Sequence, residues 1–215
     1  MEMFITILLF VPAILISLIV HEYAHARVAY NLGDPTAKYS GRLTLNPMNH
    51  LDLWGALVLV TTFLASGGKF CFGWAKPVPI NPYNFKNYFK DSMLVGLAGP
   101  LANFAMAASG GLLFRLLIPS SYNTFTLILL LFLKTFIVVN IGLGLFNLIP
   151  VPPLDGSRIL MGLMPKDLAW KYNELERTSP MIIFFILIIL IVTGLINVIL
   201  VPPFVFLYKL FTGVG

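Results

Sequence analysis

Long apolar stretches separated by polar connections make up most of the chain. Residues 3–20 contain no charged side chain, and residues 92–114, 125–149 and 180–200 are also long enough to cross a hydrocarbon layer as helices. Residues 53–66 are equally apolar but only 14 residues long, which is short for a span and closer to a re-entrant segment. The pattern predicts an all-α integral membrane protein with about four full transmembrane helices plus a re-entrant segment.

The polar connections carry weaker structural signals. Residues 31–52 contain several turn-forming residues, and within them Tyr39–Leu45 alternates as a short β-strand does. This alternation predicts a small strand-like loop near the end of the first apolar stretch. Residues 67–91 form a loop of glycine, proline, aromatic and lysine residues, and residues 155–179 are polar again.

The composition favours a membrane protein over a soluble one. Hydrophobic residues make up 58% of the 215 residues, charged residues make up 11%, and the mean hydropathy is +0.89. These values exclude a soluble globular domain and a disordered chain.

The basic residues are not clustered within the net charge of +5, so we expect no nucleic-acid partner. The single cysteine, Cys71, excludes an internal disulfide and a thiolate-rich metal cluster. The length fits one domain over residues 1–215, with a core at 3–165 and a peripheral helix and tail at 180–215.

One short motif has the residue types and spacing of a known zinc-binding pattern. His21, Glu22 and His25 form an H-E-x-x-H match at the end of the first apolar stretch. On a helix, positions i and i+4 share a face, so both imidazoles can bind one Zn²⁺ while Glu22 takes a proton from the activated water. The alternative is a pair of helix-end histidines without a metal, but three such polar side chains are costly at the end of an apolar helix unless they have a function. The motif predicts one zinc ion per chain.

A hydrolytic zinc site needs a third protein ligand and an open position for water. Asp155 is the best candidate among the nine acidic residues. The prolines before it end the preceding helix and leave an extended segment, and Gly156 permits a turn just after it. Two alternatives stay open: Asp155 caps the following helix, or His50 is the third ligand. His50 and Asp52 form either a capping pair or a second metal site.

Three asparagines, Asn103, Asn140 and Asn147, lie at membrane depth in the predicted helices. They are candidates for binding the substrate backbone or for orienting the zinc ligands through hydrogen bonds. The alternative is hydrogen bonding between helices, which polar side chains in lipid form routinely, and for Asn140 this alternative is favoured.

Three motifs follow one another along the chain: His21-Glu22-Tyr23-Ala24-His25, then Gly99-Pro100-Leu101-Ala102-Asn103, then Phe146-Asn147 through Leu154-Asp155-Gly156. Together they resemble the site-2 protease family, peptidase family M50, which consists of zinc metalloproteases that cut inside the membrane. The similarity covers residues 10–165, and Phe72–Pro79 resembles the compact prokaryotic branch without PDZ or CBS domains. The resemblance implies zinc bound by His21, His25 and Asp155, with Glu22 as the general base and Asn103 near the active site.

The basic residues provide a check on topology. His25 and Asp155 both lie at the C-terminal end of an apolar stretch, so they can share a metal only if those ends lie on one side of the membrane. A re-entrant segment at 53–66 gives this arrangement and places 11 of the 14 Lys and Arg residues on that side, whereas a full crossing gives a more even split. The positive-inside rule then makes the metal side cytoplasmic. We expect a multi-pass protein of the cell membrane, the prokaryotic plasma membrane.

These residues together predict an intramembrane zinc endopeptidase that cleaves a transmembrane helix of a membrane-protein substrate, as in regulated intramembrane proteolysis. The expected partners are that substrate and the lipid bilayer, and no oligomeric state is predicted. The alternative is a non-catalytic membrane metal-binding or transport protein, because transporters also place His and Asp at the midplane. That alternative does not explain a glutamate directly after the first histidine.

Overall fold

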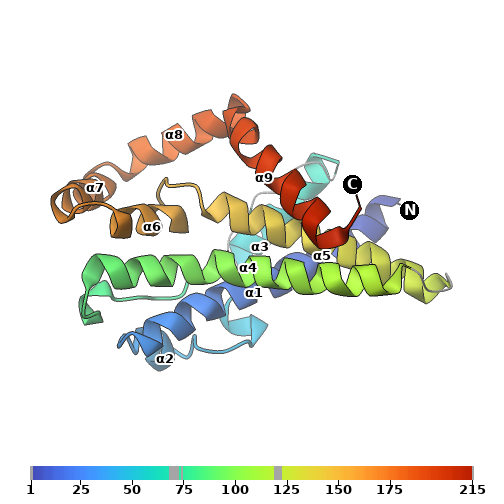
Figure 1. Ribbon diagram of the computed structural model, residues 1–215, viewed down its shortest axis with the longest axis horizontal. Helices are drawn as coiled ribbons and strands as arrows, with labels where there is room; N and C mark the ends of the chain where they lie inside the picture. The colour runs from blue at the N-terminus through green and yellow to red at the C-terminus, as the bar shows by residue number, and fades with distance from the viewer. Residues whose placement is uncertain (1, 68–72, 74, 119–122, 215) are drawn as a thin grey trace.

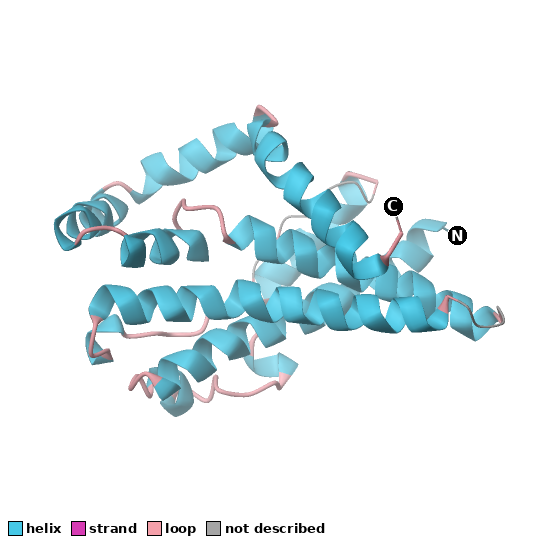
Figure 2. Cartoon of the chain, viewed as in Figure 1, coloured by secondary structure: helices cyan, strands magenta, loops and turns pink. Residues whose placement is uncertain are grey.

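The computed structural model describes residues 2–67, 73, 75–118 and 123–214, and within these ranges the protein is built from helices (Figures 1 and 2). The α-helices are α1 (Glu2–Asn31), α2 (Thr36–Tyr39), α3 (Leu53–Ala65), α4 (Tyr88–Leu117), α5 (Thr124–Asn147), α6 (Asp155–Leu163), α7 (Lys166–Thr178), α8 (Pro180–Val192) and α9 (Leu195–Thr212). Two short 3₁₀ helices, η1 (Pro47–Asn49) and η2 (Pro82–Asn84), lie in the connections. Cys71, Phe72 and Trp74 lie outside the described residues.

Four helices in the described part of the chain are long and apolar enough to cross a membrane: α1 from Ile5 onward, α4, α5 and α9. The predicted stretches at 92–114 and 125–149 correspond to α4 and α5. α3 is apolar but has only 13 residues. The prediction of an all-α integral membrane protein with about four spans is therefore confirmed.

Helices α1 and α4 run in opposite directions. The imidazole of His21 lies against Asn103, whereas His25, one turn later on α1, lies against Val95, two turns earlier on α4. The residue numbers of the partners on α4 thus decrease as the residue numbers on α1 increase. This antiparallel packing brings the C-terminal half of α1 beside the N-terminal half of α4.

Helices α4 and α5 are also antiparallel, and small residues bring them close together. Gly144 on α5 lies against Phe104, and Gly110, further along α4, lies against Ile137, which precedes Gly144. A Cβ atom at Gly144 would lie only 2.6 Å from the Phe104 ring, so this contact depends on glycine. It follows that α1 and α5 run in the same direction and that their C-terminal ends point toward the same end of the bundle.

The segment between α1 and α4, residues 32–87, begins and ends at that same end of the bundle. It contains α3, which contacts α1 through the stacked rings of Phe10 and Phe63, with centroids 4.8 Å apart. Leu59 of α3 adds a contact to the buried cluster around Ile14. The predicted re-entrant segment requires residues 32–87 to start and finish at the same end of the bundle. A single full crossing by this segment would instead place its last residue at the opposite end.

The prediction of a strand-like loop at Tyr39–Leu45 is wrong. α2 ends at Tyr39, a turn follows in which Gly41 has φ +66°, and none of the described residues between α2 and η1 forms a strand. The side chain of Arg42 is buried and turns inward instead of standing out from a sheet. Its guanidinium donates hydrogen bonds to backbone carbonyls of three residues that follow, namely Asn49, Lys76 and Pro77.

The apolar stretch predicted as a single span at 180–200 is divided between two helices. α8 ends at Val192, Gly194 adopts the left-handed conformation with φ +74°, and α9 then departs in a new direction (Figure 1). The fourth candidate span is therefore α9, which continues through Pro202 and Pro203. Aromatic residues of α9 pack around buried residues of α4 and α5; the cluster includes Ala107, Ile137, Ile141, Phe204, Tyr208 and Phe211.

Asp34 joins the two ends of the 32–87 segment. Its buried carboxylate accepts hydrogen bonds from the backbone and hydroxyl of Thr36, at 3.1 and 2.5 Å, from the Asn81 backbone at 2.7 Å and from the Asn84 amide at 2.7 Å. Burial raises the pKa of this carboxyl, but the four hydrogen bonds outweigh burial and lower the pKa below its ordinary value. Asp34 is therefore ionised at neutral pH and fixes the loop before α4 to the end of α1.

We predict that Asp34→Ala lowers the free energy of unfolding by about 2 kcal/mol at pH 7, because buried donors lose a charged acceptor. Because the folded pKa lies below the unfolded value of about 3.9, this contribution is present above that value and is lost as the pH falls through the folded pKa. Thermal unfolding in detergent at pH 7 and at about pH 3 measures the difference between the two proteins. Asp167→Ala, an exposed acid in the first turn of α7, is the matched control. An Asp34→Ala deficit that grows on acidification would contradict the assignment.

Candidate metal centre

His21 and His25 stand one turn apart on α1, and their rings meet edge to face with centroids 4.6 Å apart. Both side chains are buried, at 5% and 6% exposure. Their Nε2 atoms lie 2.9 Å from each other. The helical spacing therefore produces the convergence that the motif predicts.

The second nitrogen of each ring is already hydrogen-bonded. His21 Nδ1 lies 2.6 Å from the Asn103 side-chain oxygen, and His25 Nδ1 lies 2.7 Å from the Val95 carbonyl oxygen. Both partners are acceptors, so each Nδ1 carries the proton and each Nε2 presents a lone pair. Two lone pairs that face each other at 2.9 Å repel unless a cation lies between them.

Asp155 completes the group from the opposite end of the sequence. Its Oδ2 atom lies 3.1 Å from His21 Nε2 and 3.2 Å from His25 Nε2. Asp155 is the first residue of α6, after Leu154 in an extended conformation, and no side chain caps this helix. The prediction of Asp155 as the partner of the two histidines agrees with this geometry, and the alternative of a helix-capping role does not.

A glycine makes the position of Asp155 possible. A Cβ atom at Gly156 would lie 2.4 Å from the Leu148 carbonyl oxygen and 2.3 Å from that of Ile149. Any other residue would push the start of α6 away from the end of α5. The sequence Asp155-Gly156 thus allows the chain to fold back and present the carboxylate to α1.

The three side chains have the properties of a divalent metal site. Their ligand atoms all lie within 4.8 Å of one another. The carboxyl group of Asp155 faces both Nε2 atoms through Oδ2. Oδ2 is buried and accepts no hydrogen bond from the described residues. Two imidazole nitrogens and one carboxylate oxygen form a zinc ligand set that leaves a fourth position open for water.

Gly99 lets α4 approach the two imidazoles. A Cβ atom at this position would lie 2.5 Å from His21 Cε1 and 2.5 Å from His25 Nε2, which is an overlap. The sequence marks Gly99 only as the first residue of the Gly99–Asn103 motif and does not place it against the two histidines. A packing contact of this kind has no chemical signature beyond the small residue itself.

Asn103 and Asn140 connect the metal centre to α5. Asn103 is fully buried; its oxygen accepts from His21, and its amide nitrogen donates to Asn140 Oδ1 at 2.9 Å. The Asn140 nitrogen donates in turn to the Phe136 carbonyl at 2.9 Å. Asn103 therefore orients His21 directly and Asn140 orients Asn103, so both predicted interpretations, orientation of a ligand and bonding between helices, apply to this pair.

Asn147 does not belong to this network. Its amide donates to the Leu143 carbonyl of its own helix at 3.0 Å, and no hydrogen bond among the described residues joins it to the three ligands. A contact between Asn147 and substrate stays a prediction.

Glu22 lies beside the ligands, partly exposed, and contacts a segment that the sequence did not connect with it. Its Oε2 accepts a hydrogen bond of 2.9 Å from the Val78 backbone N–H. Arg42 holds the same segment through the carbonyls of Lys76 and Pro77, and the Lys76 N–H donates to the His50 carbonyl at 2.9 Å. These backbone contacts position a hydrogen-bond donor at Glu22.

His50 and Asp52 do not join the metal ligands. His50 is 1% exposed, and its Nε2 lies 2.7 Å from the Thr44 carbonyl oxygen, to which it donates. Asp52 caps α3 by accepting from the Gly55 N–H at 2.8 Å. The capping interpretation of Asp52 is confirmed, and the third side chain beside His21 and His25 is Asp155 and not His50.

We predict that Gly99→Ala removes zinc binding, because the added methyl group occupies the space of the two imidazole edges. Elemental analysis of the purified protein measures zinc per chain. Gly142→Ala on α5 is the matched control, since a Cβ atom there meets nothing within 4 Å. Equal zinc content in wild type and Gly99→Ala would show that α4 does not approach the histidines this closely.

Asn103→Ala should weaken zinc binding about 10- to 100-fold, because removal of a hydrogen bond that orients a ligand typically costs this much. Competition with a chelator of known affinity measures the change. Asn147→Ala, which removes only a hydrogen bond within α5, should retain wild-type affinity. Equal losses in both variants would argue against a specific role of Asn103.

Comparison with known proteins agrees with this centre. The model of peptidase family M50 matches residues 9–194. The chain is 40% identical over 197 residues to "Putative zinc metalloprotease YwhC" of Bacillus subtilis, covering 89% of this chain and 84% of that protein. It is 28% identical over 185 residues to "Putative zinc metalloprotease Rip2" of Mycolicibacterium smegmatis, covering 85% and 66%.

"Zinc metalloprotease MJ0392" of Methanocaldococcus jannaschii is 35% identical over 123 residues, which are 55% of this chain and 33% of that protein. No solved structure matches the chain significantly. The family match includes all three metal-binding candidates and spans most of the sequence. The chain therefore belongs to peptidase family M50, the site-2 protease family of zinc metalloproteases.

Proposed function

We propose that this zinc metalloprotease cleaves a transmembrane segment of a membrane-protein substrate, with one zinc ion per chain held by His21, His25 and Asp155. The observation that carries the proposal is the position of the three converging ligand atoms. Two of them belong to α1 and the hydrogen-bonded Asn103 belongs to α4, and both helices are candidate membrane spans. A hydrolytic centre built into spanning helices acts on peptide bonds that lie at membrane depth.

The chain's own residues divide the chemical work. Zinc, when bound, supplies an acidic water and polarises the peptide carbonyl. Glu22 accepts the proton of the attacking water and passes it to the leaving amine. The Val78 N–H holds Oε2 of Glu22, and no described residue donates a hydrogen bond to Oε1, which leaves this oxygen for the proton. Asn103 and the Val95 carbonyl keep both imidazoles in the tautomer that leaves Nε2 free.

The substrate must unwind locally before it is cut. In an intact helix the backbone carbonyls are hydrogen-bonded within the helix, and an apolar environment offers no replacement partners. The centre lies next to residues 75–80, which form neither helix nor strand and contain Pro77 and Pro79, so the segment lacks two of its N–H donors. This surface suits an unwound peptide. A cut within a transmembrane segment would release part of a membrane protein, as in regulated intramembrane proteolysis.

We further propose that the metal centre faces the cytoplasm of a prokaryotic cell and that α3 is re-entrant. The return of residues 32–87 to the C-terminal end of α1 supports the second point. The excess of Lys and Arg at that end supports the first.

Replacing Glu22 by Gln should abolish proteolysis while zinc stays bound, because the amide keeps the shape of the side chain but cannot take a proton. The expected loss of rate is at least about 100-fold. Comparative membrane proteomics of cells that carry wild type or Glu22→Gln gives the readout: a membrane protein that accumulates only with the variant is the candidate substrate. Elemental analysis of both purified proteins is the control. Identical membrane proteomes, or transport of zinc by both proteins, would contradict a proteolytic function.

A further inference from the structure

Asp155 stands in the first turn of α6, a helix of only nine residues, and the chain on both sides of it is bonded to α7. Before Asp155, the Pro150 carbonyl accepts a hydrogen bond of 3.0 Å from the Tyr172 hydroxyl. After it, the Arg158 guanidinium lies 3.1 Å from Oε1 of Glu176. Helices α6 and α7 lie together at one end of the molecule (Figure 1). Two contacts to one neighbouring helix therefore flank Asp155 in the chain.

The spacing of the two contacts makes them act on the same short piece of chain. Tyr172 and Glu176 are four residues apart on α7, so their side chains leave the same face of this helix. Their partners are Pro150, in the connection between α5 and α6, and Arg158, in the first turn of α6 beside Asp155. One face of α7 therefore holds both the entry to α6 and its first turn.

Buried packing fixes the position of α7. Ala169 of α7 is fully buried in one cluster with Phe89 of α4 and Met161 of α6, and the Tyr172 ring packs against this cluster. A ring that is already held by packing loses little further conformational freedom when its hydroxyl donates to a carbonyl. The hydrogen bond from Tyr172 is therefore a contact between two ordered segments.

The packing of α6 on α4 leaves one movement of Asp155 unopposed. A Cβ atom at Gly96 would lie 3.1 Å from the Arg158 Cβ atom and 3.1 Å from the Asp155 carbonyl oxygen, so the first turn of α6 rests directly on α4. A line of contact along a helix resists separation but resists rotation about that line much less. The two bonds from α7 oppose such a rotation, because they attach to the chain before and after Asp155.

We propose that Tyr172 and Glu176 are positioning residues of the metal centre. Through their bonds to the chain on either side of Asp155, they fix the direction in which this residue presents Oδ2 to the two imidazoles. The inference rests on the ligand set proposed above and adds to it a dependence on α7. Metal affinity then depends on a helix that supplies none of the three ligands.

The test measures zinc affinity by competition with a chelator, on the purified full-length protein in detergent. Tyr172→Phe removes the hydroxyl and keeps the ring, and Glu176→Gln keeps the shape of the side chain and removes its charge. Each change should weaken zinc binding about threefold, which corresponds to one ordinary hydrogen bond, and the double variant about tenfold. Arg158→Gln removes the same ion pair from α6 and replaces Glu176→Gln if that variant fails to fold.

A second readout reports the arrangement of the ligands. Co²⁺ bound in place of zinc has a visible absorption spectrum that changes with the geometry of its ligands. The double variant should bind Co²⁺ with an altered spectrum, because the carboxylate is presented in a different direction. A spectrum identical to that of wild type, together with wild-type zinc affinity, would overturn the proposal.

A double-mutant cycle with Asp155→Ala separates positioning from a general structural role. In the Asp155→Ala background the two histidines alone remain of the proposed ligand set. The Tyr172→Phe/Glu176→Gln pair should then cause no further loss of zinc affinity, because the residue that it positions is absent. An equal loss with and without Asp155 would show that α7 acts on the fold as a whole and not on the third ligand.

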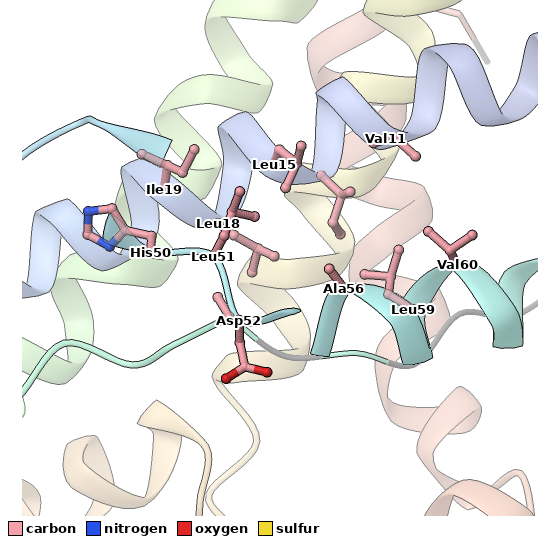
Figure 3. Close-up of a pocket in the computed structure, with 12 residues that line it drawn as sticks. Val11, Leu15, Leu18, Ile19, His50, Leu51, Asp52, Ala56, Leu59 and Val60 are labelled. Atoms are coloured by element: carbon pink, nitrogen blue, oxygen red, sulfur yellow. The ribbon is translucent and has the colours of Figure 1, made fainter. Parts of the chain in front are cut away.

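Two control variants bracket the effect. Glu174→Gln changes an exposed acid on the same helix and should retain wild-type zinc affinity. Leu59→Ala enlarges the apolar cavity of about 230 Å³ between α1 and α3, which none of the three ligands lines (Figure 3). It should lower the thermal stability and leave zinc affinity unchanged, which shows that loss of stability alone does not weaken the centre.

The outcomes distinguish this inference from the proposed ligand set. If zinc affinity depends on Asp155 but is the same in wild type and in the double variant, α7 does not position the ligand and the ligand set stands. If Asp155→Ala binds zinc as tightly as wild type, or wild type binds no zinc, the proposed ligand set fails and the positioning role fails with it.

Discussion

The close approach of two neutral imidazoles and a carboxylate inside an apolar helix bundle is the constraint on which the rest of the structure depends. His21 and His25 present lone pairs to each other and to Asp155 within 3.2 Å, and this arrangement is unfavourable without a cation. The bundle holds it through hydrogen bonds on the far side of each ring. Gly99 removes the side chain that would otherwise separate α4 from the histidines. Helix packing therefore stabilises the arrangement of these three side chains, in addition to the choice of residue types.

The same constraint determines the path of the chain. Because His25 and Asp155 meet, α1 and α5 must end at the same end of the bundle, and antiparallel α4 lies between them. The 32–87 segment then has to leave and return on one side. Its return places the Val78 N–H at Glu22, so the excursion contributes to the site as well as connecting two helices.

The sequence was most informative where chemistry is local. The H-E-x-x-H spacing determines the positions of His21 and His25 on any helix, and Asp155 stood out because prolines and a glycine surround it. Helices α4 and α5 followed from hydropathy alone. Hydropathy failed at Gly194, since a left-handed glycine divides an apolar run without changing its composition. Period-two alternation failed at Tyr39–Leu45, because Arg42 is buried and its guanidinium bonds to backbone carbonyls of distant residues, which the alternation does not reveal.

Backbone groups were beyond the reach of sequence analysis. The donor to Glu22 is the N–H of Val78 and the acceptor of His25 is the carbonyl of Val95, and neither depends on the identity of its side chain. Both are positioned by contacts between segments far apart in the chain, such as that of Arg42 with Pro77. Residue types therefore identify the metal ligands, whereas the groups that orient the ligands and the base become visible only in three dimensions.

Packing also explains how Asp155 reaches the centre without help from the metal. A Cβ atom at Gly96 would lie 3.1 Å from the Asp155 carbonyl oxygen, and one at Gly162 would lie 2.3 Å from Met93 Cβ, so glycines at two places let α6 lie directly on α4. These contacts surround the carboxylate but do not involve it. Asp155 is therefore held in place by the α4–α6 interface, which lowers the conformational entropy that binding of a metal there would have to overcome.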